Sequence, residues 1–134
     1  MRLALVSLLV LACGGAPAKP AITDRDWSLV AIGERLHTVG MDGKPITLRL
    51  DSASSRASGF AGCNQYSGAY TLAGDKLTFG PTMSTKMFCE PSQRLEDAYL
   101  GALGLVSTWE LAGDTLVLRS PGMPEMRFFP LAAK

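Results

Sequence analysis

A chain of 134 residues has the length of one ordinary domain and can bury a hydrophobic core. Its composition is that of a globular protein, with 47% hydrophobic and 19% charged residues. The formal net charge of +1 provides no basic surface for a phosphate backbone, so we expect no nucleic-acid partner.

The first residues combine one positive charge with a short apolar run. Arg2 precedes an apolar run over residues 3–12 that is too short to cross a bilayer and suits the core of a signal peptide. The run ends in Val10-Leu11-Ala12-Cys13. It resembles the lipobox of bacterial lipoproteins, in which an aliphatic residue three places before a cysteine and a small residue just before it mark cleavage and lipid attachment to that cysteine. We therefore expect a signal peptide over residues 1–12, a lipid on Cys13 and a flexible tether over residues 13–25. The alternative is an ordinary secretory signal in which Cys13 has no role.

The predicted address follows from this N-terminus. Gly14, not aspartate, follows the expected lipidated cysteine, a pattern that in Gram-negative lipoproteins usually goes with transfer to the outer membrane. We expect a protein of the bacterial cell envelope, held on the outer membrane and facing the periplasm. In that oxidising compartment the other two cysteines, Cys63 and Cys89, are expected to form a disulfide. The alternative is two separate buried thiols.

From Asp26 onward the chain reads as a folded domain over residues 26–134, built of short strands. Residues 27–32 and 46–50 alternate apolar and polar side chains. Glycines inside the strand-like stretch 58–70 predict a bend near residues 62–64, with Asn64-Gln65 in a left-handed turn. Gly-Asp pairs at residues 74–75 and 113–114 predict two hairpins, and residues 126–131 form the last strand.

One amphipathic helix interrupts the strands after Pro91. Its apolar side is predicted to consist of Leu95, Ala98, Tyr99, Ala102, Leu103 and Val106. Arg94, Glu96 and Asp97 are predicted to lie away from that side. A single helix among seven or eight antiparallel strands can bury its apolar side only in the hollow of a curled sheet. The predicted fold is therefore α+β and β-rich, a curled sheet or partly open barrel packed around the helix.

These residues carry a family resemblance. The segment 59–70 contains a Gly-Cys-Asn core followed by tyrosine and glycine, and a Thr-x-Met-x-Cys segment follows at residues 85–89. Together with Glu96, Tyr99-Leu100 and the second Gly-Asp hairpin, the pattern resembles the META domain of HslJ-like heat-inducible lipoproteins. The resemblance implies a lipid-anchored envelope protein linked to stress and antibiotic tolerance, in a family with no established enzymatic activity.

The shared motif also supplies candidate recognition residues. They are Gly62, Asn64, Gln65, Tyr66, Gly68, Thr85 and Met87. For Asn64, Gln65 and Tyr66 we favour a structural role, with a side-chain amide capping a turn and a tyrosine lying over the sheet, over a recognition surface beside the bend.

Residues with catalytic or metal-binding chemistry are sparse. His37 is the only histidine, and we expect it to be a solvated loop residue rather than the base of a hydrolase with Asp42 or Asp51. Met83, Met87 and Cys89 alternate and could point to the same face of one strand. Soft sulfur ligands of this kind select Cu(I). The disulfide and core packing compete for these sulfurs, so we expect no catalytic residue, metal or cofactor.

The expected function is binding. We expect a monomeric, non-enzymatic, lipid-anchored binding or scaffold module whose partner is another envelope protein, a peptide or a small amphiphile held in the mouth of the barrel. One alternative is an inhibitor of a secreted hydrolase, which would display a stiff loop at residues 33–45 or 51–56. A less favoured alternative is a weak hydrolase that uses His37.

Overall fold

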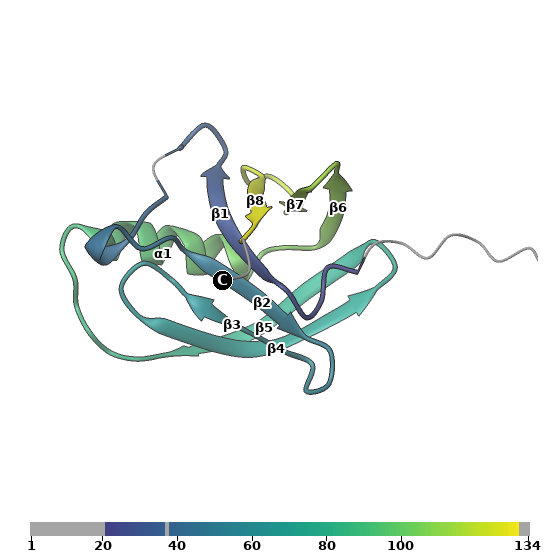
Figure 1. The fold of residues 1–134 in the computed structure, drawn as a ribbon, viewed down its shortest axis with the longest axis horizontal. Helices are drawn as coiled ribbons and strands as arrows, with labels where there is room; N and C mark the ends of the chain where they lie inside the picture. Colours follow the sequence, from purple (N-terminus) through teal and green to yellow (C-terminus); the bar gives the residue numbers. More distant parts are fainter. Residues whose placement is uncertain (1–20, 37, 132–134) are drawn as a thin grey trace, which may run out of the picture.

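A computed structural model of the chain describes residues 21–36 and 38–131, in which eight strands form a ring around one α-helix (Figure 1). Every strand pairs antiparallel with the next along the chain, and the last pairs with the first. The elements are β1 (Asp26–Ile32), the 3-10 turn η1 (Met41–Gly43), β2 (Thr47–Asp51), β3 (Arg56–Phe60), β4 (Gln65–Ala73), β5 (Lys76–Ser84), α1 (Ser92–Leu103), β6 (Thr108–Ala112), β7 (Thr115–Arg119) and β8 (Met126–Pro130). The predicted β-rich α+β class is confirmed.

Alternation along the strands builds the core. In β1 and β2 the buried positions alternate with partly exposed ones, so that Trp27, Leu29, Leu48 and Leu50 point into the ring. Strand pairing places Trp27 opposite Leu48. Because the period of two is a property of the strand itself, these inward residues could be predicted from the sequence alone.

The two Gly-Asp pairs form tight turns. Gly74 connects β4 to β5 with φ +60°, and Gly113 connects β6 to β7 with φ +61°. Both lie in the left-handed region that L-residues with a Cβ rarely adopt. Each turn closes a hairpin whose strands pair up to the turn, at Ala73↔Lys76 and at Ala112↔Thr115.

The ring is uneven at one seam. The nine residues of β5 pair along their length with β4, across a bulge at Gly80 and Pro81 that lies opposite Ala69. On its other side β5 has only the register pair Lys76↔Thr108 with β6. The helix α1 connects these two strands along the chain. The ring is therefore closed at the start of β5 and open along the rest of it.

The helix fills the hollow of the ring. Tyr99 and Leu103 are fully buried, and the ring of Tyr99 meets those of Tyr66 and Phe128 edge-on, with centroids 5.6 Å and 6.4 Å away. The predicted apolar side is wrong at two positions. Ala98 is exposed, whereas Glu96, expected to point away, is 2% exposed.

The folded part begins earlier than expected. Ile22 is 2% exposed, and its carbonyl accepts a hydrogen bond of 2.9 Å from the indole N–H of Trp27. The carboxylate of Asp24 accepts hydrogen bonds from the backbone and the hydroxyl of Ser52 at 2.9 and 2.5 Å. The predicted tether over residues 13–25 is thus too long, because its last residues complete the core. The signal peptide and Cys13 lie outside the described residues.

The strand expected to carry Met83, Met87 and Cys89 on one face ends at Ser84. Residues 85–91 form a loop that runs around one end of the molecule, at the left in Figure 1, before α1 begins. The shared face predicted for the three sulfurs is therefore absent. Among the described residues, no helix has the length and apolarity needed to cross a membrane.

Candidate functional site

The bend between β3 and β4 lies at the centre of the shared motif. Its positive φ falls on Gly62, at +122°, and not on Asn64 or Gln65, so the predicted left-handed turn is misplaced. The N–H of Ala61 donates to the carbonyl of Asn64 at 2.8 Å and closes the bend. The 3-10 turn packs against it: the N–H of Met41 donates to the carbonyl of Gly62 at 2.7 Å.

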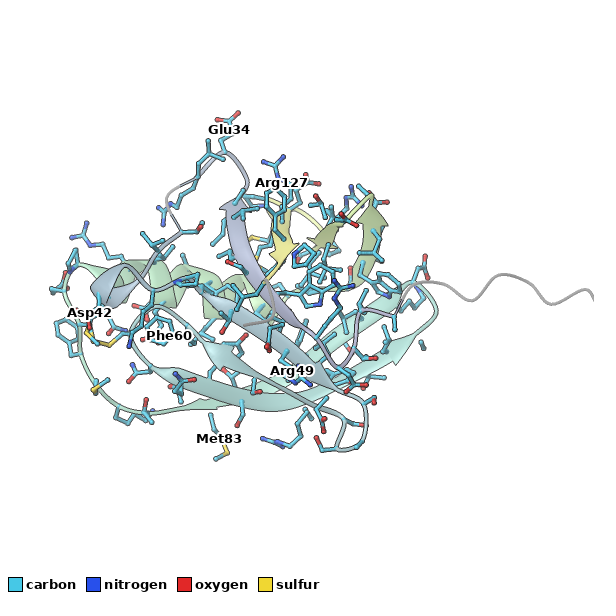
Figure 2. All side chains as sticks on the ribbon, viewed as in Figure 1. Glu34, Asp42, Arg49, Phe60, Met83 and Arg127 are labelled. Atoms are coloured by element: carbon cyan, nitrogen blue, oxygen red, sulfur yellow. A yellow bond between two sulfur atoms is a disulfide. The ribbon has the colours of Figure 1, made fainter. Side chains whose placement is uncertain are left out.

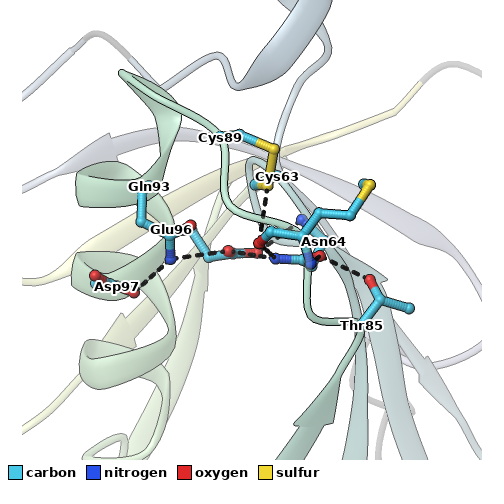
Figure 3. The surroundings of a disulfide bond; sticks show 8 residues. Cys63, Asn64, Thr85, Cys89, Gln93, Glu96 and Asp97 are labelled. Atoms are coloured by element: carbon cyan, nitrogen blue, oxygen red, sulfur yellow. Dashed lines mark hydrogen bonds between the residues drawn. A yellow bond between two sulfur atoms is a disulfide. The ribbon is translucent and has the colours of Figure 1, made fainter.

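The side chain of Asn64 holds the 85–91 loop (Figure 3). Its Oδ1 accepts hydrogen bonds from the hydroxyl of Thr85 and the N–H of Met87, both at 2.9 Å. Its Nδ2 donates to the carbonyl of Met87 and to Oε2 of Glu96, also at 2.9 Å. Both donors and both acceptor sites of the amide are used. Asn64 is 3% exposed, so we assign it a structural role.

Glu96 completes this cluster from the helix. Its Oε1 accepts the backbone N–H of Asn64 at 2.8 Å, and its Oε2 also lies 3.4 Å from Nε2 of Gln93. Gln93 donates in turn to Asp97 at 3.0 Å (Figure 3). Sequence reasoning missed Glu96 because a charged residue beside an apolar stripe is normally solvated. The only signal was its presence in the family motif.

A disulfide joins Cys63 to Cys89, with Cα atoms 5.7 Å apart and a sequence separation of 26 residues. The alternative of two separate thiols does not hold in this structure. Cys63 is 1% exposed, and the carbonyl of Cys89 accepts the N–H of Gln93 at 2.7 Å. The bond thus ties the bend to the start of α1. Because Cys89 is oxidised, it provides no thiolate for a Cu(I) site with Met83 and Met87.

Two tyrosines continue the network into the core. The hydroxyl of Tyr66 donates to the carbonyl of Thr47 at 2.8 Å, which uses its only proton, so the hydroxyl of Tyr99 donates to Tyr66 at 2.5 Å. Burial raises the pKa of Tyr66 well above its usual value, and the neighbouring Tyr99 adds to the shift. Burial likewise raises the pKa of Tyr99, against a smaller lowering by its hydrogen bond with Tyr66.

The predicted recognition residues divide into two groups. Four are buried, namely Gly62, Asn64, Tyr66 and Gly68. Three are exposed, namely Gln65, Thr85 and Met87. The buried group fixes backbone positions; at Gly68 an added Cβ would stand 2.9 Å from the carbonyl oxygen of Pro81. A recognition surface can therefore draw on the exposed group only. His37 lies outside the described residues.

The surface near this cluster is apolar. Met83, Met87 and Phe88 are 71%, 54% and 74% exposed, and Met83 projects from the outer side of the β4–β5 sheet (Figure 2). A shallow depression of about 650 Å³ lies between the 3-10 turn and the start of α1. It is lined by apolar Val39, Met41 and Leu95 and by charged Arg35, Asp42, Glu90 and Arg94. In the described part of the chain no three His, Cys, Asp or Glu side chains are grouped to hold a metal.

The structure defines a small β-rich domain in which a ring of strands encloses one helix. A disulfide connects the β3–β4 bend to the segment that leads into this helix. The family model of the META domain matches residues 20–133, so the chain belongs to the META domain family. This confirms the family suggested by the Gly-Cys-Asn and Thr-x-Met-x-Cys segments. The matched range also includes Ile22, consistent with its place in the core.

Solved structures share the fold. A protein from Burkholderia xenovorans, solved by NMR, has a TM-score of 0.67 and 28% identity, covering 89% of this chain and 99% of its own. A second NMR structure has a TM-score of 0.62 at 20% identity, with coverages of 78% and 87%. A DUF4847 family protein from Bacteroides vulgatus has a TM-score of 0.58 at 13% identity, with coverages of 84% and 95%. A comparison with curated proteins gave no match.

Proposed function

We propose that this chain is a lipid-anchored protein of the bacterial envelope whose META domain binds a partner and catalyses no reaction. The observation that carries the proposal is the loop of residues 85–91. It exposes the side chains of Met87 and Phe88 to solvent, although the free energy of an apolar side chain is lower when it is buried away from water. The disulfide at Cys89 and the amide of Asn64 hold this loop from both ends.

The arrangement of the motif supports binding over catalysis. Asn64, Glu96, Tyr66 and Tyr99, which have the polar groups that an active site would need, spend their hydrogen bonds on one another and on the backbone. An enzyme instead directs such groups toward a substrate in a cleft. A loop fixed before the partner arrives loses less entropy on binding, which favours affinity.

The anchor in this proposal is the lipid on Cys13, with envelope stress or antibiotic tolerance as the setting. Mass spectrometry of the intact mature protein tests the anchor directly. The expected mass begins at Cys13, includes the diacylglyceryl and acyl groups, and lacks two hydrogens because of the disulfide. A mature protein cleaved elsewhere and without lipid would contradict the proposed address and leave the fold unaffected.

Site-specific photo-crosslinking tests the binding surface. A photoreactive phenylalanine analogue replaces Phe88 in one variant and Asp114 in a matched control. Asp114 is also exposed, but it lies in the β6–β7 turn at the opposite end of the molecule (Figure 1). We expect discrete crosslinked species in intact cells from position 88 only. Equal crosslinking from both positions, or none from position 88, would refute the proposal.

Inhibition of a secreted hydrolase remains a second candidate because one of its expected loops is well braced. In the turn between β2 and β3, Asp51 accepts hydrogen bonds from the backbone and hydroxyl of Ser54, and Asp24 holds Ser52. An inhibitor would lose potency when this turn is replaced. A protein that binds its partner through the loop of residues 85–91 would keep its affinity after the same replacement. The hydrolase alternative predicts that His37→Ala abolishes activity; we expect no effect on phenotype.

A further inference from the structure

The seam between β5 and β6 leaves part of a strand without a neighbour. All of β5 pairs with β4, but its pairing with β6 stops at Lys76↔Thr108, supplemented by the hydrogen bond of 3.1 Å from the N–H of Leu77 to the carbonyl of Ser107. Beyond Leu77 the strand continues for seven residues to Ser84. This stretch is an open sheet edge, which we call the β5 edge (residues 78–84).

Hydrogen-bond alternation shows which backbone groups face outward. Leu77 directs its N–H toward β6, so Phe79, two residues on, faces the same side. After the bulge, the N–H of Thr85 donates to the carbonyl of Gln65 in the direction of β4. Counting back by alternation, Met83 faces β4, and Thr82 and Ser84 face away from it.

The outward groups have no partner within the described chain. No hydrogen bond between elements or from a side chain involves the outward N–H or C=O of Phe79, Thr82 or Ser84. Proline usually blocks a sheet edge by removing a donor. Here Pro81 sits at the bulge with its carbonyl oxygen against Gly68 of β4, so it leaves the open side intact.

The β5 edge also lacks the usual electrostatic protection. Natural edges carry lysine or other charged residues that discourage pairing with another chain, and residues 77–84 have no charged side chain. Met83 lies between Thr82 and Ser84, and its side chain is 71% exposed. The apolar side chains of Met87 and Phe88 follow in the next loop and are also exposed. A complementary partner therefore has an extended backbone and apolar side chains.

We propose that the β5 edge binds an extended, apolar peptide segment of another protein as an added strand, through the backbone of Thr82 and Ser84. The inference rests on the proposed binding function and specifies its partner class. The added strand gains main-chain hydrogen bonds from the edge and side-chain contact with Met83 and the loop of residues 85–91. The sequence of such a partner is recognised by its apolar pattern, because the hydrogen bonds involve backbone groups only.

Amide hydrogen exchange of the full mature protein, followed by NMR, tests this. The probe is a soluble peptide of about nine residues with alternating valine and threonine, the length and pattern of a strand. In the free protein we expect fast exchange at Thr82 and Ser84 and slow exchange at Met83, which pairs with β4. Saturating peptide should slow Thr82 and Ser84 and leave Met83 unchanged. The same peptide with alternate amides N-methylated should have no effect.

Two variants at one position separate backbone from side-chain recognition. Ser84→Pro removes an outward N–H without touching the β4 ladder, and Ser84→Ala keeps it. We expect the affinity for the peptide, measured by fluorescence anisotropy, to fall about threefold to tenfold in Ser84→Pro and to remain unchanged in Ser84→Ala. If Ser84→Pro does not fold, Thr82→Pro removes the neighbouring outward donor and serves the same purpose.

Several results would overturn the inference. They are slow exchange at Thr82 and Ser84 in the free monomer, equal loss of affinity in both Ser84 variants, or protection that appears with protein concentration and no peptide, which would mean that a second copy occupies the edge. Absence of peptide protection together with crosslinking from position 88 would remove this partner class and leave the binding function standing. Absence of both would remove both.

Discussion

The buried contact between Asn64 and Glu96 yields a sharp prediction, because one substitution changes its chemistry and hardly changes its shape. Asn64→Asp keeps the size of the side chain and replaces Nδ2, which donates to Glu96 and to the carbonyl of Met87, by an oxygen. Two carboxyl groups then face each other across a hydrogen-bond distance. Such a pair cannot remain fully ionised, so one carboxyl group takes up a proton.

The magnitude follows from the cost of that proton. An aspartate with an ordinary pKa near 3.9 binds a proton at pH 7 at a cost of about 4 kcal/mol, from 1.36 kcal/mol per pH unit. The protonated group restores one of the two lost hydrogen bonds, and the other costs about 1 kcal/mol. We therefore expect Asn64→Asp to lower the free energy of unfolding by about 5 kcal/mol at pH 7.

The sign of the pH dependence is opposite to that of an ordinary salt bridge. The neighbouring carboxylate raises the pKa of the introduced carboxyl group in the folded state, so the folded state binds more protons than the unfolded state. The lost stability is then regained as the pH falls toward the unfolded pKa, leaving a deficit of about 1 kcal/mol near pH 4. Asn64→Ala removes all four side-chain hydrogen bonds and should cost about 3–5 kcal/mol at both pH values.

Urea unfolding followed by tryptophan fluorescence at pH 7 and pH 4 measures these differences against the unaltered protein. If Asn64→Asp is unfolded at neutral pH, acidification should refold it, and Asn64→Ala should show no such recovery. A deficit for Asn64→Asp that is small at pH 7, or equal at both pH values, would refute the assignment of Asn64 as donor to a buried carboxylate.

Three further predictions concern the core, the disulfide and the glycines. Tyr66→Phe leaves the carbonyl of Thr47 without the hydrogen bond from this hydroxyl and should lower the free energy of unfolding by about 2–3 kcal/mol in urea unfolding. In the unaltered protein, the pKa of Tyr66 is higher in the folded state than in the unfolded state, which stabilises the fold at pH values below the unfolded pKa. The stability should therefore fall as the pH rises above about 10. Replacing Cys63 and Cys89 together by alanine opens a loop whose ends are 26 residues apart and should cost about 3.5 kcal/mol, with a lower Tm that dithiothreitol no longer changes. Gly59→Ala should cost at least about 2 kcal/mol because its Cβ would stand 2.1 Å from the carbonyl oxygen of residue 47. Gly101→Ala, in the helix with open space around it, should instead gain about 1 kcal/mol, and equal effects at the two glycines would contradict the packing described.

The local parts of the fold could be predicted because their cause is local. Alternation placed Trp27 and Leu48 inside the sheet, since a strand turns its side chains to opposite faces whatever it packs against. The Gly-Asp pairs marked the turns at Gly74 and Gly113, since few residues adopt a positive φ. Helical spacing correctly predicted that Tyr99 is buried, although it wrongly predicted the same for Ala98.

The polar part of the site could not be predicted because its cause is tertiary. Helical periodicity places Glu96 outside the apolar stripe, and only the approach of the β3–β4 bend covers it and supplies the donors of Asn64. Likewise the expected strand over Met83 and Met87 fails at Ser84, where the amide of Asn64 captures the backbone of Met87 in a loop. These contacts join residues more than 20 positions apart, beyond the reach of any local pattern.

By itself the sequence determined the strand-rich domain, its two glycine turns, its single helix and its family, because periodicity and motif spacing depend only on the order of residues in the chain. Only the tertiary structure decided that Asn64 and Glu96 are buried partners, that Ile22 belongs to the core, and that β5 keeps an open edge. The physical reason is that burial and pairing depend on which distant segment arrives to cover a residue, and a side chain's own chemistry does not specify that segment.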